Sequence, residues 1–441
     1  MTLGRADAAR SARSGLSRRT FLRGVAATGA VAAATPLLDA CGSDSGSGSG
    51  KATVTFWTYH PEETKFWPQV ISDFEAAHPN ISIKQRIFAD PGQYISAIQP
   101  AVASGDYPDV FPPSLFVLNF GKQGVTRDLN AALGKPFTDQ FFPSANAAYI
   151  DGDKQYGVGW QAQTYGMFYN PELLARAGVQ YPETWDDLLN IAKPLQAIGV
   201  TPCVLPGNPG TYANDFFLPL VTQAADDPNA MRKMDLQQDG ATWNSQPVID
   251  ALGMFKKLID GGVFQPGITS TTIQQAYAQF YTGKAALFFC GNFGQAALQQ
   301  SAPEAFKSAY KIGQTPAWKS GAKHWCGNQA GNNLALSANS KNPDAAVEWF
   351  KYIFESGRYI AFTNNIQGIP SLKSLADQVT DPITKEMASW LIQGNGCPHT
   401  CYGTGASDAV ANQLSALVKG GVTASAAAAS IQTDAQRALG R

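Results

Sequence analysis

Residues 54–111 decide the fold class, and they read VTFWTYHPEETKFWPQVISDFEAAHPNISIKQRIFADPGQYISAIQPAVASGDYPDVF. The apolar run at 54–57 is typical of a short buried strand, and the run at 81–87 alternates as a half-buried strand does. Helical patterns at 62–78 and 94–104 follow these two strands, and a third short strand closes the stretch. This order predicts an α/β sheet with parallel pairings. Ligands of such sheets collect beyond the carboxyl ends of the strands.

The same alternation continues beyond residue 156. Thr184, followed three residues later by Asp187, is typical of the capped start of a helix. Beyond residue 50 the chain has 391 residues, which is enough for two ordinary domains. Strands are expected at 156–160, 166–170, 200–205, 285–290 and 334–336, and helices from Asn170-Pro171, at 344–354 and, in two pieces, at 407–439.

The N-terminal residues indicate that the chain is exported. SRRTFL at 17–22 places two adjacent arginines before a mildly apolar stretch, which is the layout of a twin-arginine signal. That stretch, at 24–40, is too short and too rich in Ala and Gly to span a membrane as a stable helix. We therefore expect residues 1–40 to be an export signal.

The apolar stretch ends at Cys41, and this boundary resembles the cleavage box of bacterial lipoproteins. Asp39 departs from that pattern, which prefers a small or apolar residue there. Residues 41–50 are rich in Gly and Ser and are typical of a flexible tether. We expect Cys41 to carry a lipid, so that the tether holds the folded part at the outer face of the cytoplasmic membrane.

The charge balance argues against nucleic acid and anionic bilayers as partners. The chain has 33 basic and 34 acidic residues, and several of its arginines lie in the expected signal, so the mature protein is mildly acidic. Charged residues make up only 15% of the chain while aromatic residues reach 11%. This combination favours a neutral, hydroxyl-rich ligand over a charged one, although most of the rings must belong to the core.

Five cysteines remain besides Cys41, and an exported chain permits disulfides. Cys397 and Cys401, in the loop-like run GNGCPHTCYG, are the candidate pair, although the sequence does not fix the connectivity. The same run, together with His324 and Cys326, could also be read as a zinc cluster. The oxidising compartment favours the disulfide, so we expect no metal and no cofactor.

Five segments follow one another in a set order along the chain. They are YPDVF (107–111), YGVGWQAQTYGMFYNPELLARAGVQYPETWDDLL (156–189), GKAALFFCGNFG (283–294), GNNLALSANSKNPDAAVEWFKYI (331–353) and GIPSLKS (368–374). This ordered set resembles the extracellular solute-binding proteins of bacterial ABC importers, specifically their carbohydrate-binding group. The resemblance runs from about Thr53 to the C-terminus.

The resemblance implies a periplasmic-binding-protein-like fold of type II topology, with two α/β lobes that close on a ligand in the cleft between them. Lobe 1 is expected at 51–162 plus 313–363, and lobe 2 at 163–312 plus 364–441.

Sugar sites pair aromatic faces, which stack on the apolar side of a pyranose, with planar polar groups that bind hydroxyls. Trp57 could equally be a core residue, and Asp90 could equally form a turn. The resemblance expects a stacking ring at Asn292-Phe293 and an aromatic contact at Tyr402. The candidates in the first lobe and at the hinge are Trp57, Tyr59, His60, Asp90, Trp160, Gln161 and Tyr165. Those of the second lobe and the crossing strand are Tyr212, Asn292, Phe293, Trp325, Asn332 and Tyr402.

The resulting hypothesis is a monomeric, membrane-tethered receptor that captures a sugar or oligosaccharide by lobe closure and delivers it to an ABC permease. A receptor of the same fold for a different solute, such as a polyol, a polyamine, a phosphate ester or a metal chelate, is a second hypothesis. A third is a surface interaction protein that has lost transport, and a fourth is an exported glycan-active enzyme.

Sequence motifs do not support an enzyme. The expected folded part contains no HExxH and no GxSxG. GVGWQA at 157–162 imitates a dinucleotide-binding fingerprint, but Trp160 and Gln161 lie before another strand rather than at a helix N-terminus. A glycosidase would need two positioned carboxylates, and no arrangement singles out a pair. We therefore expect no enzyme and no catalytic residues.

Overall fold

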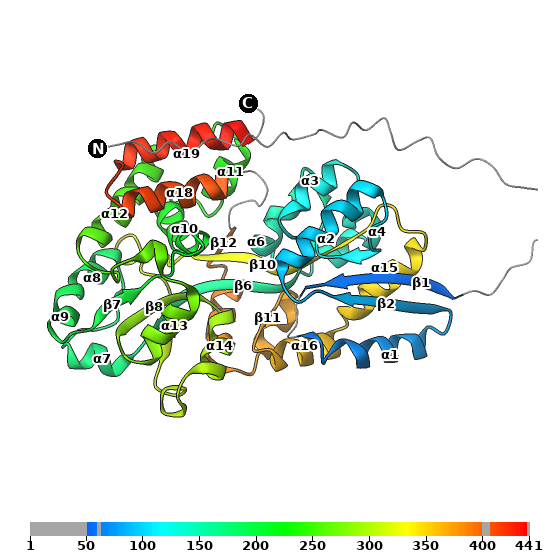
Figure 1. The fold of residues 1–441 in the computed structure, drawn as a ribbon, viewed down its shortest axis with the longest axis horizontal. Helices are drawn as coiled ribbons and strands as arrows, with labels where there is room; N and C mark the ends of the chain where they lie inside the picture. Colours follow the sequence, from blue (N-terminus) through cyan, green and yellow to red (C-terminus); the bar gives the residue numbers. More distant parts are fainter. Residues whose placement is uncertain (1–50, 60–62, 399–405, 439–441) are drawn as a thin grey trace, which may run out of the picture. The chain divides into compact units, whose positions relative to one another are not determined.

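The computed structural model describes residues 51–59, 63–398 and 406–438, all within one compact unit that spans residues 50–441 (Figure 1). Up to residue 169 the elements are β1 (Ala52–Thr58), α1 (Trp67–Ala77), β2 (Ile81–Ile87), α2 (Pro91–Ser104), β3 (Val110–Phe111), η2 (Ser114–Phe116), α3 (Val117–Lys122), α4 (Leu129–Leu133), α5 (Lys135–Thr138), α6 (Pro143–Asn146), η3 (Ala147–Tyr149), β4 (Ile150–Asp151), β5 (Lys154–Gln155) and β6 (Val158–Tyr169).

The next elements run to residue 313. They are α7 (Pro171–Arg176), α8 (Trp185–Asn190), α9 (Ala192–Ala197), β7 (Thr201–Val204), α10 (Thr211–Ala225), α11 (Ala230–Leu236), α12 (Gln246–Asp260), η4 (Ile268–Ser270), α13 (Ile273–Tyr281), β8 (Ala285–Gly291), α14 (Phe293–Ser301), η5 (Glu304–Phe306) and β9 (Lys311–Gly313). The remaining ones are β10 (Cys326–Leu336), α15 (Pro343–Ile353), α16 (Ser356–Asn365), β11 (Ile369–Pro370), η6 (Lys373–Gln378), α17 (Pro382–Ile392), β12 (Gly396–Pro398), α18 (Ala406–Val418) and α19 (Ala424–Ala438).

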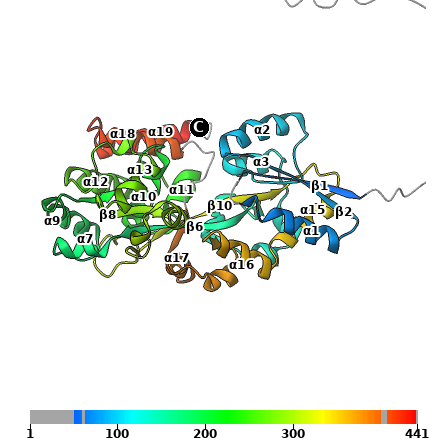
Figure 2. The same ribbon diagram turned by 60° about the horizontal axis from the view of Figure 1, so that its bottom comes forward.

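One sheet runs through the structure in the order β2-β1-β3-β10-β6-β8-β7. β1 is parallel to β2 and β3, and β7 is parallel to β8, which confirms the expected parallel pairings. β10 is antiparallel to both β3 and β6. The long strands β6 and β10 therefore connect the two halves of the sheet, and the turned view shows them running between two groups of elements (Figure 2).

Each half of the sheet has its own hydrophobic core. In the first, Phe56 of β1 packs with Trp67 and Trp349 of the covering helices α1 and α15. In the second, Trp185 of α8 and Phe216 of α10 pack in a separate cluster beside β7 and β8. We call these halves lobe 1 and lobe 2, and they confirm the two-lobed α/β fold.

The predicted lobe boundaries stay a prediction. Trp318 and Trp325, just before β10, pack against the lobe 2 core. Leu334 and Leu336, near the end of β10, belong to the lobe 1 core. This packing favours a crossing within β10 rather than at residue 313.

Local chemistry explains where several helices begin. Thr184 and Asp187 form the expected capping box at the start of α8. The first helix begins at Trp67 rather than at residue 62, with Pro68 in its first turn, where the missing N–H of proline costs no hydrogen bond. The second begins earlier than expected because Asp90 caps it.

The two strands expected at 156–160 and 166–170 are one continuous strand, β6. Glycine permits its close packing: a Cβ at Gly159 would lie 2.7 Å from the Cβ of Ala330, and one at Gly166 would lie 2.8 Å from the Trp390 ring. β10 is also longer than the expected strand at 334–336, because its polar, glycine-rich first part pairs with β6.

Among the helices of the described residues, none has both the length and the apolar character needed to cross a bilayer.

Candidate ligand-binding cleft

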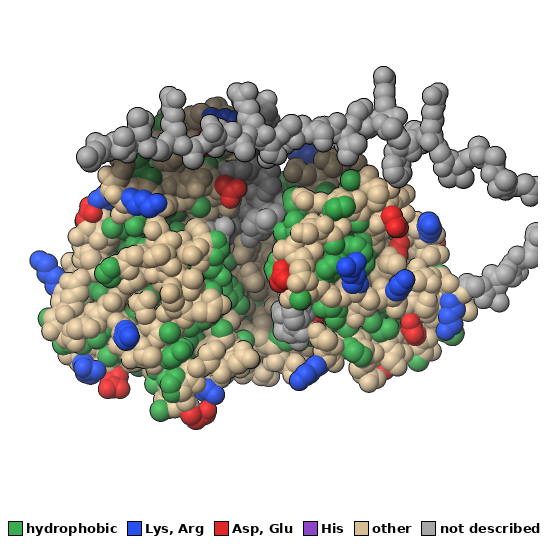
Figure 3. Space-filling model, in the orientation of Figure 1, with side chains coloured by type: hydrophobic (Ala, Val, Ile, Leu, Met, Phe, Trp, Pro, Cys, Tyr) green, Lys and Arg blue, Asp and Glu red, His purple; other side chains and the backbone are tan. Residues whose placement is uncertain are grey.

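The strands of both lobes point their carboxyl ends toward a common region beside β6 and β10. In the space-filling view the surface is hollowed between the two lobes (Figure 3). We call this region the cleft. Its candidate residues are those that lie on the crossing strands or shortly beyond strand ends, namely Gln163, Tyr165 and Gln329 on β6 and β10, Tyr59 after β1, Tyr212 and Asp215 at the start of α10, and Phe293 after β8. This is where ligands of open α/β sheets collect.

A neutral hydrogen-bonding group forms the floor of the cleft. Gln163 and Gln329 lie opposite each other on paired strands, so their side chains share one face. The Gln329 Nε2 donates to Gln163 Oε1 at 3.0 Å and to the Tyr165 hydroxyl at 2.6 Å. Tyr165 is among the residues predicted from the sequence, and its ligand contact stays a prediction, whereas the sequence analysis missed both glutamines.

Two glycines of β10 make room for this group. A Cβ at Gly331 would lie 2.6 Å from the Gln163 Nε2, and one at Gly327 would lie 3.3 Å from the Tyr165 ring. These glycines flank Gln329 in the sequence, two residues away on each side, and this spacing was a signal from which Gln329 could have been predicted.

Phe293 contributes an aromatic ring from lobe 2. It is the first residue of α14, directly beyond β8, and its ring packs edge-on at 6.3 Å from the Tyr165 ring. Asn292 is only 2% exposed, and its Oδ1 accepts a hydrogen bond from the Thr164 N–H at 3.1 Å. Asn292 therefore fixes the turn that places Phe293, and its own contact with a ligand stays a prediction.

Tyr212 and Asp215 lie at the start of α10, near Cys290 of β8. Burial, with smaller contributions from the nearby Cys290 and Asp215 groups, raises the pKa of Tyr212 to about 12. Tyr212 thus keeps its proton over the whole physiological range and remains able to donate a hydrogen bond.

We expect the phenol of Tyr212 to ionise about two pH units above free tyrosine in the folded protein. Because folding raises the pKa of Tyr212, its protonated phenol contributes to the stability of the folded protein. This contribution is complete below the unfolded pKa of about 10 and is lost as the pH rises toward 12. Absorbance at 295 nm during an alkaline titration measures the ionisation of the tyrosine phenols. Wild type and Tyr212→Phe should differ near pH 12, and a difference confined to pH 10 would contradict the burial of this phenol.

Tyr59 lies on the lobe 1 side, at the carboxyl end of β1. Its ring packs 4.8 Å from that of Tyr94, and its hydroxyl lies close enough to Tyr149 to help raise the pKa of that buried phenol, mainly an effect of burial. The Asn333 Nδ2 donates to the Tyr149 hydroxyl at 3.0 Å and to the Ser114 carbonyl at 3.1 Å. A buried polar network therefore supports the wall that carries Tyr59.

The structure places Trp160 in the lobe 1 core. Its side chain is 1% exposed and stacks on Trp67 at 5.5 Å between ring centroids. Gln161 is 8% exposed and lies beside Gly368. Neither belongs to the group that defines the cleft, and a ligand contact of either remains a prediction.

Trp57 and Asp90 have local partners in lobe 1. The Trp57 ring lies 5.1 Å from Phe88 and under the Arg86 guanidinium, and it lines a cavity of about 310 Å³ with Tyr107. Asp90 accepts from the Gln93 N–H at 2.9 Å as the cap of α2. His60 and Tyr402 lie outside the described residues, as does Cys41.

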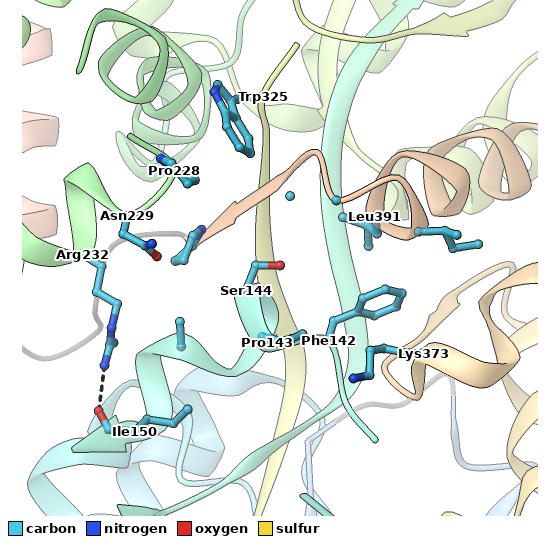
Figure 4. Close-up of a pocket in the computed structure, with 15 residues that line it drawn as sticks. Phe142, Pro143, Ser144, Ile150, Pro228, Asn229, Arg232, Trp325, Lys373 and Leu391 are labelled. Atoms are coloured by element: carbon cyan, nitrogen blue, oxygen red, sulfur yellow. Dashed lines mark hydrogen bonds between the residues drawn. The ribbon is translucent and has the colours of Figure 1, made fainter. Parts of the chain in front are cut away.

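Trp325 lines a second space between the lobes, a cavity of about 630 Å³ (Figure 4). We call it the α6 cavity, because Pro143 and Ser144 of α6 form part of its wall. The Asn328 Nδ2 donates to Ser144 at 2.6 Å, so Asn328 faces α6, whereas its neighbour Gln329 faces the cleft. The cleft and the α6 cavity therefore lie on opposite faces of the crossing strands.

Asn332, further along β10, is half-buried and has a left-handed backbone with φ 55°.

The buried cysteines show no pairing among the described residues. Cys326 of β10 pairs in register with Gly396, and Cys397 of β12 with Gly327, so the two thiols point to opposite faces. The Cys397 thiol donates to the Cys326 carbonyl at 3.1 Å. Cys401 lies outside the described residues, so the Cys397–Cys401 disulfide stays a prediction.

Within the described ranges, no group of three or more His, Cys, Asp or Glu side chains is arranged to hold a metal ion.

Comparison with known proteins gives a consistent set of relatives. The multiple sugar-binding protein of Streptococcus mutans is 23% identical over 372 residues, which cover 80% of this chain and 84% of that protein. The arabinooligosaccharide-binding protein of Bacillus subtilis is 26% identical over 197 residues, covering 43% of this chain and 45% of that protein.

Solved structures show the same fold. The GacH receptor of Streptomyces glaucescens superposes with a TM-score of 0.73 at 22% identity, covering 88% of this chain and 99% of the receptor. The cyclic alpha-maltosyl-1,6-maltose binding protein of Arthrobacter globiformis also has a TM-score of 0.73, at 18% identity and with 88% and 99% coverage. Residues 58–357 match the profile described as bacterial extracellular solute-binding protein. The chain belongs to the family of bacterial extracellular solute-binding proteins.

Proposed function

We propose that this protein is the receptor of an ABC importer for a neutral sugar or oligosaccharide. The observation that carries the proposal is the chemistry of the cleft, where the Phe293 ring packs beside the neutral Gln163–Gln329–Tyr165 floor. Rings stack on the apolar faces of sugars, and amides and hydroxyls bind their hydroxyl groups. The names of the relatives, which include multiple sugar-binding and arabinooligosaccharide-binding proteins, support the same class of ligand.

Capture requires no covalent chemistry in this proposal. The ligand would bind the residues of both lobes together only when the lobes close, so it would shift the population toward the closed form. A permease would then receive the closed complex. The relatives are binding proteins, which favours a receptor over a glycan-active enzyme.

A thermal-shift and calorimetric screen over mono- to tetrasaccharides tests the proposal. A ligand at one hundred times its Kd adds about 2.7 kcal/mol of stability. The same screen should include a polyol, a polyamine and a sugar phosphate, since these represent the competing classes of solute. Saturable binding of a neutral sugar, recovered intact by chromatography, is the expected result. Binding confined to the charged solutes, or recovery of a cleaved sugar, would contradict the proposal.

We also propose that the protein is exported and tethered through a lipid on Cys41, as the N-terminal sequence predicts. The Gly/Ser-rich residues after Cys41 would keep the receptor near its permease. Labelled fatty acid should be incorporated into the wild type and not into Cys41→Ala. Equal labelling of the two would exclude Cys41 as the lipid site.

A further inference from the structure

The cavity of about 310 Å³ that Trp57 lines lies within lobe 1, and none of its lining residues belongs to the cleft candidates or to the α6 cavity. We call it the β2 cavity. In the parallel pairing of β1 with β2, Thr55 lies opposite Lys84 and Trp57 opposite Arg86, so these four side chains share one face of the sheet. The floor is formed by Thr55 and Trp57, one wall by Lys84 and Arg86, and the other wall by Asp106, Tyr107 and Pro108.

The wall on β2 presents two positive charges. The Arg86 guanidinium carbon lies 4.2 Å from the centre of the Phe88 ring and 5.1 Å from that of the Trp57 ring. Stacking uses the flat face of a guanidinium and leaves its N–H groups free to bind a carboxylate with two hydrogen bonds. Lys84 and Arg86 are both exposed, and neither forms an ion pair with a carboxylate in the part of the chain that the structure describes.

The opposite wall presents a carboxylate and an aromatic ring. Its residues lead into β3, and β1 lies between β2 and β3 in the sheet, so this wall faces the positive wall across β1. The Tyr107 hydroxyl donates to the Val125 carbonyl at 3.2 Å, which anchors the ring. Asp109 is already engaged, because its Oδ2 accepts from the Thr55 N–H at 2.7 Å and from the Thr55 hydroxyl at 2.6 Å. The exposed Asp106 has no cationic partner among the described residues and remains available to accept a hydrogen bond.

These walls determine the chemistry of a ligand that fits between them. Arg86 and Lys84 call for a carboxylate at one end, and Asp106 calls for a hydrogen-bond donor at the other. The Trp57 and Tyr107 rings favour a flat, apolar body, and a volume at the lower end of the range for ligand pockets limits that body to about one ring.

We infer that the β2 cavity is a second ligand site, which binds a small aromatic carboxylic acid with a hydroxyl group opposite its carboxylate. The inference is independent of the proposed function, because no residue of the cleft takes part in it. The protein would thus hold a charged aromatic ligand on lobe 1 in addition to the neutral sugar proposed for the cleft.

Calorimetric titration of the intact protein with 4-hydroxybenzoate tests the inference. We expect saturable binding with a Kd of about 1 mM or below, which is reasonable for so small a ligand. The neutral 4-hydroxybenzyl alcohol has the same ring and hydroxyl without the carboxylate, and it should bind at least about ten-fold more weakly. Equal affinity for the acid and the alcohol, or no binding of the acid at ten times the expected Kd, overturns the inference.

Variants of the positive wall locate the site. Arg86→Gln and Lys84→Gln should each weaken the binding of 4-hydroxybenzoate, Arg86→Gln by about ten-fold. Arg358→Gln is the matched control, because Arg358 also lies over a ring in lobe 1, at 3.7 Å from Tyr352, but donates to Glu355 at 2.8 Å. Its Kd should stay within about two-fold of the wild type. If Arg86→Gln fails to fold, Lys84→Gln carries the same test.

Titration of the same variants with the sugar found by the screen separates this site from the cleft. Arg86→Gln should keep the sugar affinity of the wild type within about two-fold. Equal losses for the acid and for the sugar would show a general disturbance of lobe 1, and an acid affinity that both wall variants leave unchanged would place the acid elsewhere. Either result overturns the inference. Failure of all sugars to bind overturns only the proposed function, since the titration with the acid does not depend on it.

Discussion

Trp160→Ala should lower the free energy of unfolding by about 3–5 kcal/mol, the range typical of deleting a buried tryptophan from a core. The ring is 1% exposed and stacks on Trp67, with Tyr359 at 4.9 Å and Phe354 at 5.1 Å between ring centroids. Removing it leaves a cavity among Trp67 of α1, Phe354 at the end of α15 and Tyr359 of α16. Urea denaturation followed by circular dichroism measures the loss, and the lobe 1 transition should move most.

Trp57→Ala is the matched control for this experiment, because Trp57 is a half-buried ring of the same lobe that packs beside Phe88 at the cavity it lines. It should cost clearly less stability than Trp160→Ala. Below the unfolding transition, Trp160→Ala should bind ligand nearly as well as the wild type. A variant with full stability and lost affinity would instead make Trp160 the ligand contact that the sequence suggested.

Phe293→Ala should weaken ligand binding by about 2 kcal/mol, as the truncation of a well-packed aromatic anchor does, which is about 30-fold in Kd. The physical reason is the loss of an aromatic face beside the Tyr165 hydroxyl and the glutamine floor. Isothermal titration with the sugar found by the screen measures the change. Phe293→Trp keeps a ring at the site and should retain most of the affinity.

Tyr281→Ala provides the control for Phe293→Ala. Tyr281 and Phe293 both pack as half-buried rings against one further core cluster, which includes Phe288 of β8. They lie at opposite ends of β8, however, because Tyr281 ends α13 before the strand and Phe293 follows the strand. Equal losses of affinity in the two variants would show that the effect comes from lobe 2 packing and not from the cleft.

The sequence was most informative where local chemistry decides the structure. The strand at 81–87 has the expected bounds because its residues alternate, and α8 begins at Thr184 because the capping box is a local interaction. The carboxyl ends of β1 and β8 were also predictable to within one residue, while the ligand contacts of Tyr59 and Phe293 stay predictions.

The floor of the cleft could not be predicted for a physical reason. Most residues of β6 from Val158 to Phe168 are buried, so no alternation of polar and apolar residues tells which face meets the ligand. The sequence therefore singled out Trp160 and Gln161 on this strand, whose ligand contacts stay predictions, and gave no sign of Gln163. Gln329 lies in the polar, glycine-rich part of β10, which has no strand signature of its own and is ordered by pairing with β6.

The path of the chain through lobe 1 has a consequence for the order of events during synthesis. β3 needs β10 as its neighbour, and the Trp160 ring needs Tyr359 and Phe362, so lobe 1 joins residues from distant parts of the chain. Such non-local pairing slows folding. The ribosome must deliver Phe362 before this core can close, and we therefore expect lobe 1 to complete only late in synthesis. An export signal that acts on folded chains would suit such a protein, because the sheet that contains its first strand is completed only after residues near the end of the chain have been synthesised.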